Sequence, residues 1–63
     1  MMQVRSEYSG IFFFHEDDLV CVQINASYSQ IWVRGVGFPV PVMDGDALMC
    51  REVLERKARE VSA

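Results

Sequence analysis

Phe38-Pro39-Val40-Pro41-Val42 is the stretch that constrains the fold most, because it combines a strand-like apolar alternation with two prolines. In an extended strand the backbone nitrogens of residues i and i+2 point toward the same neighbour, and proline carries no N–H there. One side of this strand therefore lacks two consecutive hydrogen-bond donors. We expect the strand to pair on one side only and to close a sheet as its edge.

Three segments upstream, at about residues 11–14, 19–25 and 30–34, also have the composition of strands, with the proline segment 38–42 as a fourth. The loops between them are short and polar, which favours antiparallel hairpins, since parallel strands need long crossovers. Residues 1–9 are weakly patterned and are expected to form an arm or a short strand.

A helical pattern follows from about residue 46 to residue 61, with Asp46 as the expected N-cap. Its apolar stripe consists of Ala47, Cys50, Leu54, Ala58 and Val61, widened by Val53. The sequence therefore predicts one small α+β domain over residues 1–63. Its expected architecture is a three- or four-stranded antiparallel meander followed by one C-terminal amphipathic helix that packs on one sheet face.

Size and composition favour a protein that associates. A chain of 63 residues buries only about 60% of the surface that its unfolded form exposes. Hydrophobic residues make up 51% of this chain, more than so small a core is expected to hold, which points to a dimer or a stable partner. The formal net charge of −3 argues against non-specific binding to nucleic acid, which needs a basic surface.

The cysteines and the hydropathy pattern bear on location. Cys21 and Cys50 form no CxxC pair and have no metal-ligand spacing. The first residues lack the apolar region of a secretory signal, and no apolar run approaches the roughly 20 residues of a transmembrane helix. We expect a cytoplasmic protein with reduced thiols.

Because one helix covers one face of a sheet, the other face is expected to bind a partner. The residues expected to face the helix are Val20, Val22, Ile24, Ile31 and Val33. The opposite face would then carry Leu19, Cys21, Gln23, Gln30, Trp32 and Arg34. One alternate of the aromatic run would join it, either Phe12 and Phe14 or Ile11 and Phe13.

Trp32 and Arg34 stand out on this face, since Trp and Arg are enriched at binding hot spots. We predict a partner-binding surface formed by Phe12, Phe14, Trp32 and Arg34. The alternative is that Trp32 packs against the N-terminal arm or a loop of its own chain.

His15-Glu16-Asp17-Asp18 is the cluster most like a catalytic or metal site. Adjacent loop residues rarely converge on one ion, the chain has no second histidine, and three of the four are turn formers. We expect a hydrated hairpin turn whose acids, Glu16, Asp17 and Asp18, meet a basic patch on a partner. No metal and no cofactor are expected.

Together these features predict a non-enzymatic protein-interaction module, such as an adaptor, an antitoxin-like protein or an inhibitor of a larger protein. Two alternatives stay open: a single-stranded RNA- or DNA-binding regulator that uses the sheet aromatics, and an obligate homodimeric structural subunit. For a dimer that extends the sheet, the expected seam is an edge formed by residues 11–14 or 2–8, and not the proline strand.

Overall fold

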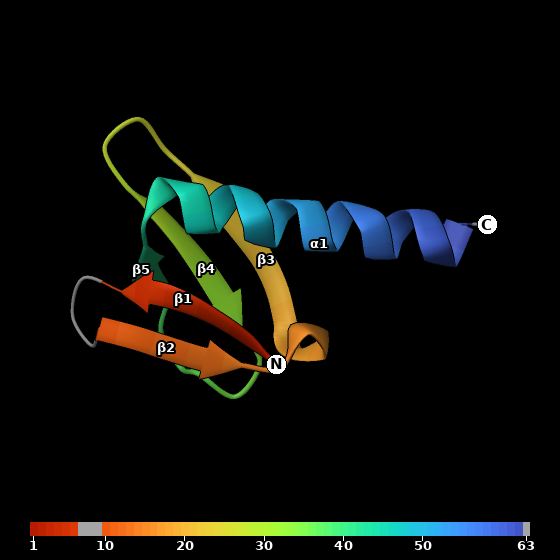
Figure 1. Ribbon diagram of the computed structural model, residues 1–63, viewed down its shortest axis with the longest axis horizontal. Helices are drawn as coiled ribbons and strands as arrows, with labels where there is room; N and C mark the ends of the chain where they lie inside the picture. Colours follow the sequence, from red (N-terminus) through yellow and green to blue (C-terminus); the bar gives the residue numbers. More distant parts are fainter. Residues whose placement is uncertain (7–9, 63) are drawn as a thin grey trace.

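The computed structural model describes residues 1–6 and 10–62 and has an α+β architecture (Figure 1). The elements are β1 (Met2–Ser6), β2 (Gly10–Phe14), the 3₁₀ helix η1 (Glu16–Asp18), β3 (Leu19–Ile24), β4 (Ser29–Val33), β5 (Val40–Val42) and α1 (Asp44–Ser62). The strands form one open antiparallel sheet in the order β2-β1-β5-β4-β3.

The predicted α+β class and the C-terminal helix on the sheet are confirmed. The sheet has five strands rather than three or four, because β1 lies within the segment that was expected to form an arm or a short strand. All five residues of β1 pair in register with β2. The remainder of that segment, residues 7–9, lies outside the described residues.

The expectation that the proline strand closes the sheet is wrong. β5 lies in the centre, between β1 and β4. Its three residues all pair with β4, whereas its register with β1 consists of one pair, Ser6 with Val42. The two sides of β5 are therefore paired to very different extents.

The prolines account for this asymmetry. The Met43 N–H donates to the Arg5 carbonyl of β1 at 3.3 Å. By strand alternation the backbone nitrogens of Pro39 and Pro41 point toward the same side as that of Met43, but they carry no hydrogen. The missing donors therefore shorten the pairing with β1 and do not prevent it, since Met43 supplies a donor just beyond the prolines.

A β-bulge in β3 changes which of its residues face the core. Leu19 pairs with Val33 and Cys21 with Trp32, so Val20 is the extra residue between two successive pairs. Leu19 turns into the core, at 6% exposure, while Val20 is 57% exposed. The expected faces of Leu19 and Val20 are both wrong, because the bulge interrupts the two-residue period on which they were based.

The helix begins at Asp44, two residues before the expected start. The Ala47 N–H donates to the Met43 carbonyl at 2.9 Å, which closes the first turn earlier. Asp46 is therefore not the N-cap; it lies in the first turn with Asp44, where negative charge is favourable. The Asp44 carboxylate accepts from the Ser29 hydroxyl at 2.8 Å, and that of Asp46 from the Arg5 N–H at 2.8 Å.

One core lies under both the helix and the β1–β2 hairpin. Its buried residues are Val4, Phe14, Leu19, Ile31, Val33, Val40, Val42, Ala47, Cys50 and Val53. The helix packs mainly on β3 and then on β4, while β1 and β2 contribute Val4 and Phe14. The hairpin residues Val4 and Phe14 thus point to the side of the sheet that the helix covers.

The far end of α1 lies beyond the sheet (Figure 1). Ala58 and Val61, which were expected to continue the buried stripe, are exposed, Val61 at 88%. The packed part of the stripe ends with the half-buried Leu54. In the part of the chain that the structure describes, no helix combines the length and apolar character needed to cross a membrane.

Candidate partner-binding surface

The aromatic run of β2 divides between the core and the surface. Phe14 is buried, and Phe12 is half-buried against the core, with the two ring centroids 5.9 Å apart. The expected partner-binding surface is therefore corrected at these two residues, which belong mainly to the core. Ile11 and Phe13 form the outward alternate and are 55% and 59% exposed.

Trp32 does face outward. Its neighbours Ile31 and Val33 are buried, so alternation along β4 directs the indole away from the core, and Trp32 remains 38% exposed. Cys21 lies opposite it on β3, and Val20 stands out of the adjacent bulge. Val20, Cys21 and Trp32 are called the Trp32 face below.

Polar side chains continue the outer side of the same strands. The Gln30 amide donates to the Gln23 side-chain oxygen at 2.8 Å, a cross-strand pair next to Trp32 and Cys21. An apolar centre with polar groups beside it is the usual layout of a protein–protein interface.

Arg34 follows β4 directly and is tied to the acidic turn. Its backbone N–H donates to the Asp18 carbonyl at 2.7 Å. The turn itself is the 3₁₀ helix η1, which His15 caps by accepting the Asp17 N–H on Nδ1 at 3.2 Å. The histidine is thus engaged in local structure. The expected hairpin turn, and with it a simple meander, is wrong, because η1 connects β2 and β3, which lie at opposite edges of the sheet and do not pair.

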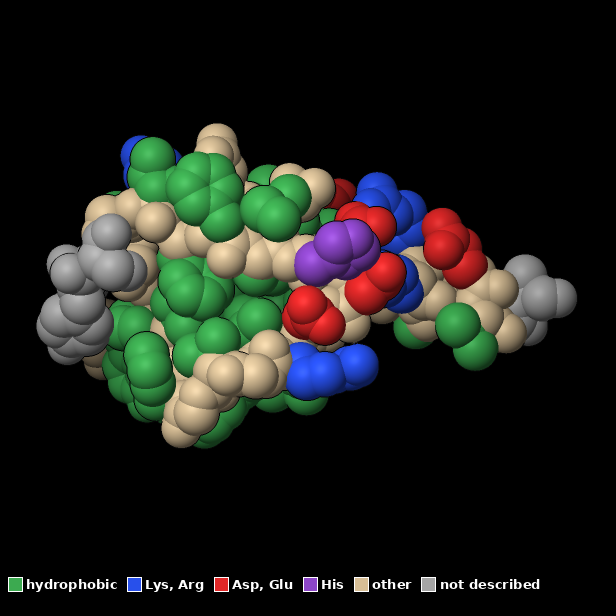
Figure 2. All heavy atoms as spheres, turned by 90° about the horizontal axis from the view of Figure 1, so that it is seen from below, with side chains coloured by type: hydrophobic (Ala, Val, Ile, Leu, Met, Phe, Trp, Pro, Cys, Tyr) green, Lys and Arg blue, Asp and Glu red, His purple; other side chains and the backbone are tan. Residues whose placement is uncertain are grey.

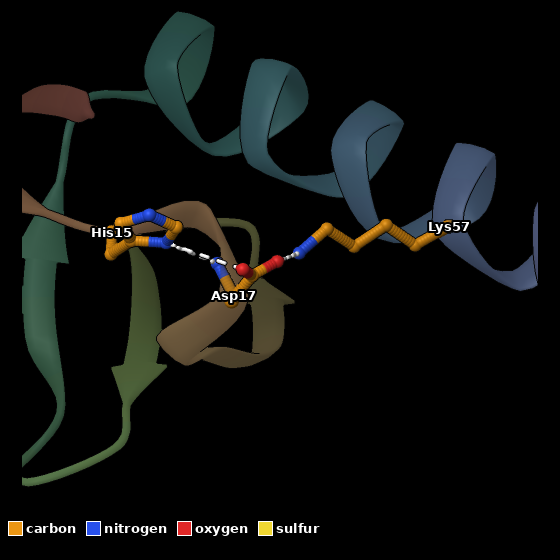
Figure 3. Close-up of polar contacts among 3 residues, drawn as sticks. All are labelled: His15, Asp17 and Lys57. Atoms are coloured by element: carbon orange, nitrogen blue, oxygen red, sulfur yellow. Dashed lines mark hydrogen bonds and ion pairs between the residues drawn. The ribbon is translucent and has the colours of Figure 1, made fainter.

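Lys57 of α1 reaches this turn from the helix (Figure 3). Its Nζ donates to Asp17 Oδ1 at 2.6 Å. The hydrogen bond from Lys57, and then its positive charge, hold the pKa of the Asp17 carboxyl below its usual value of 3.8. The contact fastens the β2–β3 connection to the helix, and it occupies one of the acids expected to meet a partner.

Sequence reasoning did not identify Lys57, although one signal was present. Lys57 lies seven residues after Cys50 and four after Val53, so it continues the buried stripe of the helix. A lysine in such a position extends its ammonium group to the border of the apolar contact. A lysine at that border is expected to pair with an acidic side chain, which here is Asp17.

The structure thus brings together five of the seven predicted site residues. Trp32 and Arg34 lie at the end of β4, beside the turn that contains Glu16, Asp17 and Asp18. Figure 2 shows hydrophobic side chains over the sheet end of the molecule, with acidic and basic side chains grouped toward the projecting helix. Phe12 and Phe14 are apart from this group, in the core.

The environment of Cys50 disfavours thiol chemistry. Cys50 is fully buried, and burial, reinforced by the negative charge of Asp46, raises the pKa of its thiol to about 11. It therefore stays protonated near neutral pH and is a poor nucleophile. Among residues 1–6 and 10–62, no group of three or more His, Cys, Asp and Glu side chains could hold a metal ion.

Two shallow pockets lie away from Trp32. One, of about 160 Å³, is lined by residues that include Tyr28 and Asp44, and the other, of about 190 Å³, by residues that include Arg5 and Asp46. Both are smaller than the roughly 300–1,000 Å³ of ordinary small-molecule sites.

No protein-family model matches the chain, and neither the curated proteins nor the solved structures include a match to it.

Proposed function

We propose that this protein is a non-enzymatic interaction module that binds a larger protein through the Trp32 face, as an adaptor or an inhibitor does. The observation that carries the proposal is the one-sided packing of the fold. The helix packs on one side of the sheet, to which Val4 and Phe14 of the β1–β2 hairpin also point, and Trp32 is exposed on the other side.

The composition of the face supports this proposal. An indole is among the side chains that contribute most to binding when they become buried in an interface. Val20, at 57% exposure, adds apolar area next to it. Arg34 and the acids of η1 provide charges at the border, where they fix the orientation of a partner more than its affinity.

The alternative of a single-stranded nucleic-acid binder is less well supported by the geometry. Such a site stacks bases on several exposed aromatic rings along a positively charged surface. Phe14 is buried and Phe12 is half-buried, and the chain carries a net charge of −3. Two of the three expected stacking rings are thus largely unavailable.

Affinity measurements on a partner isolated with the wild-type protein as bait test the proposal. Trp32→Ala is expected to weaken the complex by about 2 kcal/mol or more, roughly 30-fold in dissociation constant. Val20→Lys should also weaken it, since it places a charge within the apolar face. Ile11→Ala, at an exposed position of β2, is the control and should leave affinity unchanged.

Circular dichroism establishes that each variant is folded before its affinity is interpreted. Unchanged affinity in folded Trp32→Ala and Val20→Lys variants would remove the Trp32 face as the binding surface. Equal losses in these variants and in Ile11→Ala would show that the substitutions act through overall structure.

A further inference from the structure

The strand β2 forms one edge of the sheet, and its sequence leaves that edge open. Its one strand neighbour is β1, and the β1–β2 pairing runs through all five residues without a shift. Proteins usually protect an edge with a charge, a proline or a bulge. Gly10-Ile11-Phe12-Phe13-Phe14 contains neither a charged residue nor a proline.

The outward side chains of β2 add an apolar surface to the unpaired edge. Ile11 and Phe13 are 55% and 59% exposed, and they lie opposite Arg5 and Gln3 of β1. An extended apolar segment that joined this edge would gain both backbone hydrogen bonds and side-chain contacts.

The edge is complementary to itself. When two copies of β2 are placed antiparallel about a two-fold axis at Phe12, all five residues of each strand are paired. Ile11 of each copy then lies opposite Phe13 of the other, which gives two pairs of a β-branched and an aromatic residue, a favourable cross-strand combination. Gly10 lies opposite Phe14, so the ring at that position meets no side chain.

The β2 edge lacks the charges that would oppose a second copy there. Two chains that each carry a net charge of −3 repel one another over most of their surface. The seam itself is uncharged, since Gly10–Phe14 contains no ionisable side chain, and the nearest acids in sequence lie outside it, Glu7 before β2 and Glu16 and Asp17 after it. A second copy can therefore pair along β2 without burying a charge.

We propose that two copies of this protein associate through β2, antiparallel and with Phe12 at the two-fold axis, to form one continuous ten-stranded sheet. β1 and β5 separate β2 from β4 in the sheet order, so the dimer leaves the Trp32 face available. The inference thus goes beyond the proposed function and uses a different surface. A seam of five residues belongs among small interfaces, so the dimer is expected to dissociate in about the micromolar range.

Sedimentation velocity from about 1 µM to 1 mM, on the wild type and two variants, tests the proposal. Ile11→Lys places a charge in the seam, a device that natural edge strands use, and should raise the dissociation constant at least about tenfold. Val20→Lys is the matched control, because Val20 is also β-branched, has nearly the same exposure and lies on the opposite edge strand. It should leave the dimer unchanged.

Amide hydrogen exchange on the wild type provides a second measurement that does not depend on a variant. Protection of β2 amides should rise with protein concentration, while that of β3 amides should not. A monomer at every concentration, a dimer that Ile11→Lys leaves intact, or β2 protection that is independent of concentration would each overturn the proposal. Loss of partner binding in Trp32→Ala is measured separately, so failure of the dimer and failure of the proposed function give different results.

Discussion

The two hairpins of this sheet are similar in size and different in design. Each pairs five residues in register, but β1–β2 runs without a shift, whereas β3–β4 contains the bulge at Val20. The helix packs mainly on β3 and β4. The β1–β2 hairpin joins the central strand through one registered pair and one adjacent backbone bond, and it joins the helix through the bond from Arg5 to Asp46.

This difference determines which edge of the sheet can pair with a strand of another chain. The bulge makes the β3 edge irregular, and irregular edges pair poorly with other chains. The β2 edge is regular and uncharged, and its hairpin shares few backbone hydrogen bonds with the rest of the sheet, which is typical of segments that open locally. A very small domain can in this way keep one hairpin as the base of its core and leave the edge of the other open to a second copy.

The largest effect is expected from the core of the helix-covered hairpin. Ile31 is fully buried and pairs with Val22 and Val40, so Ile31→Ala should lower the free energy of unfolding by about 3 kcal/mol. Ile11→Ala makes the same truncation at an exposed position of β2 and should change the free energy of unfolding of the monomer by less than about 0.5 kcal/mol. Urea denaturation followed by circular dichroism measures both. Similar losses in the two variants would contradict the contrast between the hairpins.

The second effect tests the burial of the helix through its thiol. The folded pKa of Cys50 is raised from 9.0 to about 11, so the unfolded chain releases this proton first as the pH rises. The stability that the protonated Cys50 thiol contributes is fully present below pH 9 and is lost between pH 9 and 11. The free energy of unfolding should fall by about 2 kcal/mol over this range. Cys50→Ala should be less stable at neutral pH but decline less steeply over this window, as urea titrations at each pH would show. Cys21→Ser is the control and should keep the wild-type slope.

The third effect concerns how β1–β2 is attached. Asp46→Ala removes the acceptor for the Arg5 N–H and should destabilise the hairpin by about 1 kcal/mol. Amides of β1 and β2 should then exchange faster, while those of β3 and β4 keep their rates. Asp46→Asn retains an acceptor oxygen and should have a smaller effect. Equal acceleration in both hairpins would mean that they open together and would break the comparison.

The features that followed from the sequence are those with a local cause. The 3.6-residue period identified the helix, and the short loop before residue 29 identified the β3–β4 hairpin, whereas the equally short loop at residues 15–18 joins two strands that do not pair. The two prolines predict one donor-poor side of β5, which is observed, but the Met43 N–H just beyond them donates to the Arg5 carbonyl. The position of β5 in the sheet therefore depends on Met43, which lies just outside the stretch 38–42.

The remaining features depend on contacts between distant residues. Pairing with β1 decides which residues of the aromatic run in β2 face inward. The bulge at Val20 decides which residues of β3 face inward. Neither feature has a clear local pattern in the sequence. Trp32 was placed outward correctly because β4 keeps a regular period of two. The bond between Asp17 and Lys57 spans 40 residues, so only the fold brings its partners together.

The smallest effect is expected at this bond, which fixes the turn between the two hairpins to the helix. Lys57 lowers the pKa of Asp17 below 3.8. The stability that the ionised Asp17 contributes is therefore present above pH 3.8 and is lost as the pH falls through the pKa of the folded state. Lys57→Met should return the Asp17 pKa toward 3.8, as an NMR titration of the carboxyl group would show, with little change in overall stability because Asp17 is exposed. Salt should have a similar effect on the wild type, by screening the pair. Arg56→Met, the control, removes the neighbouring positive charge and should leave the Asp17 pKa low. If it raised that pKa as much as Lys57→Met did, the general charge of the helix, and not this one contact, would hold the turn in place.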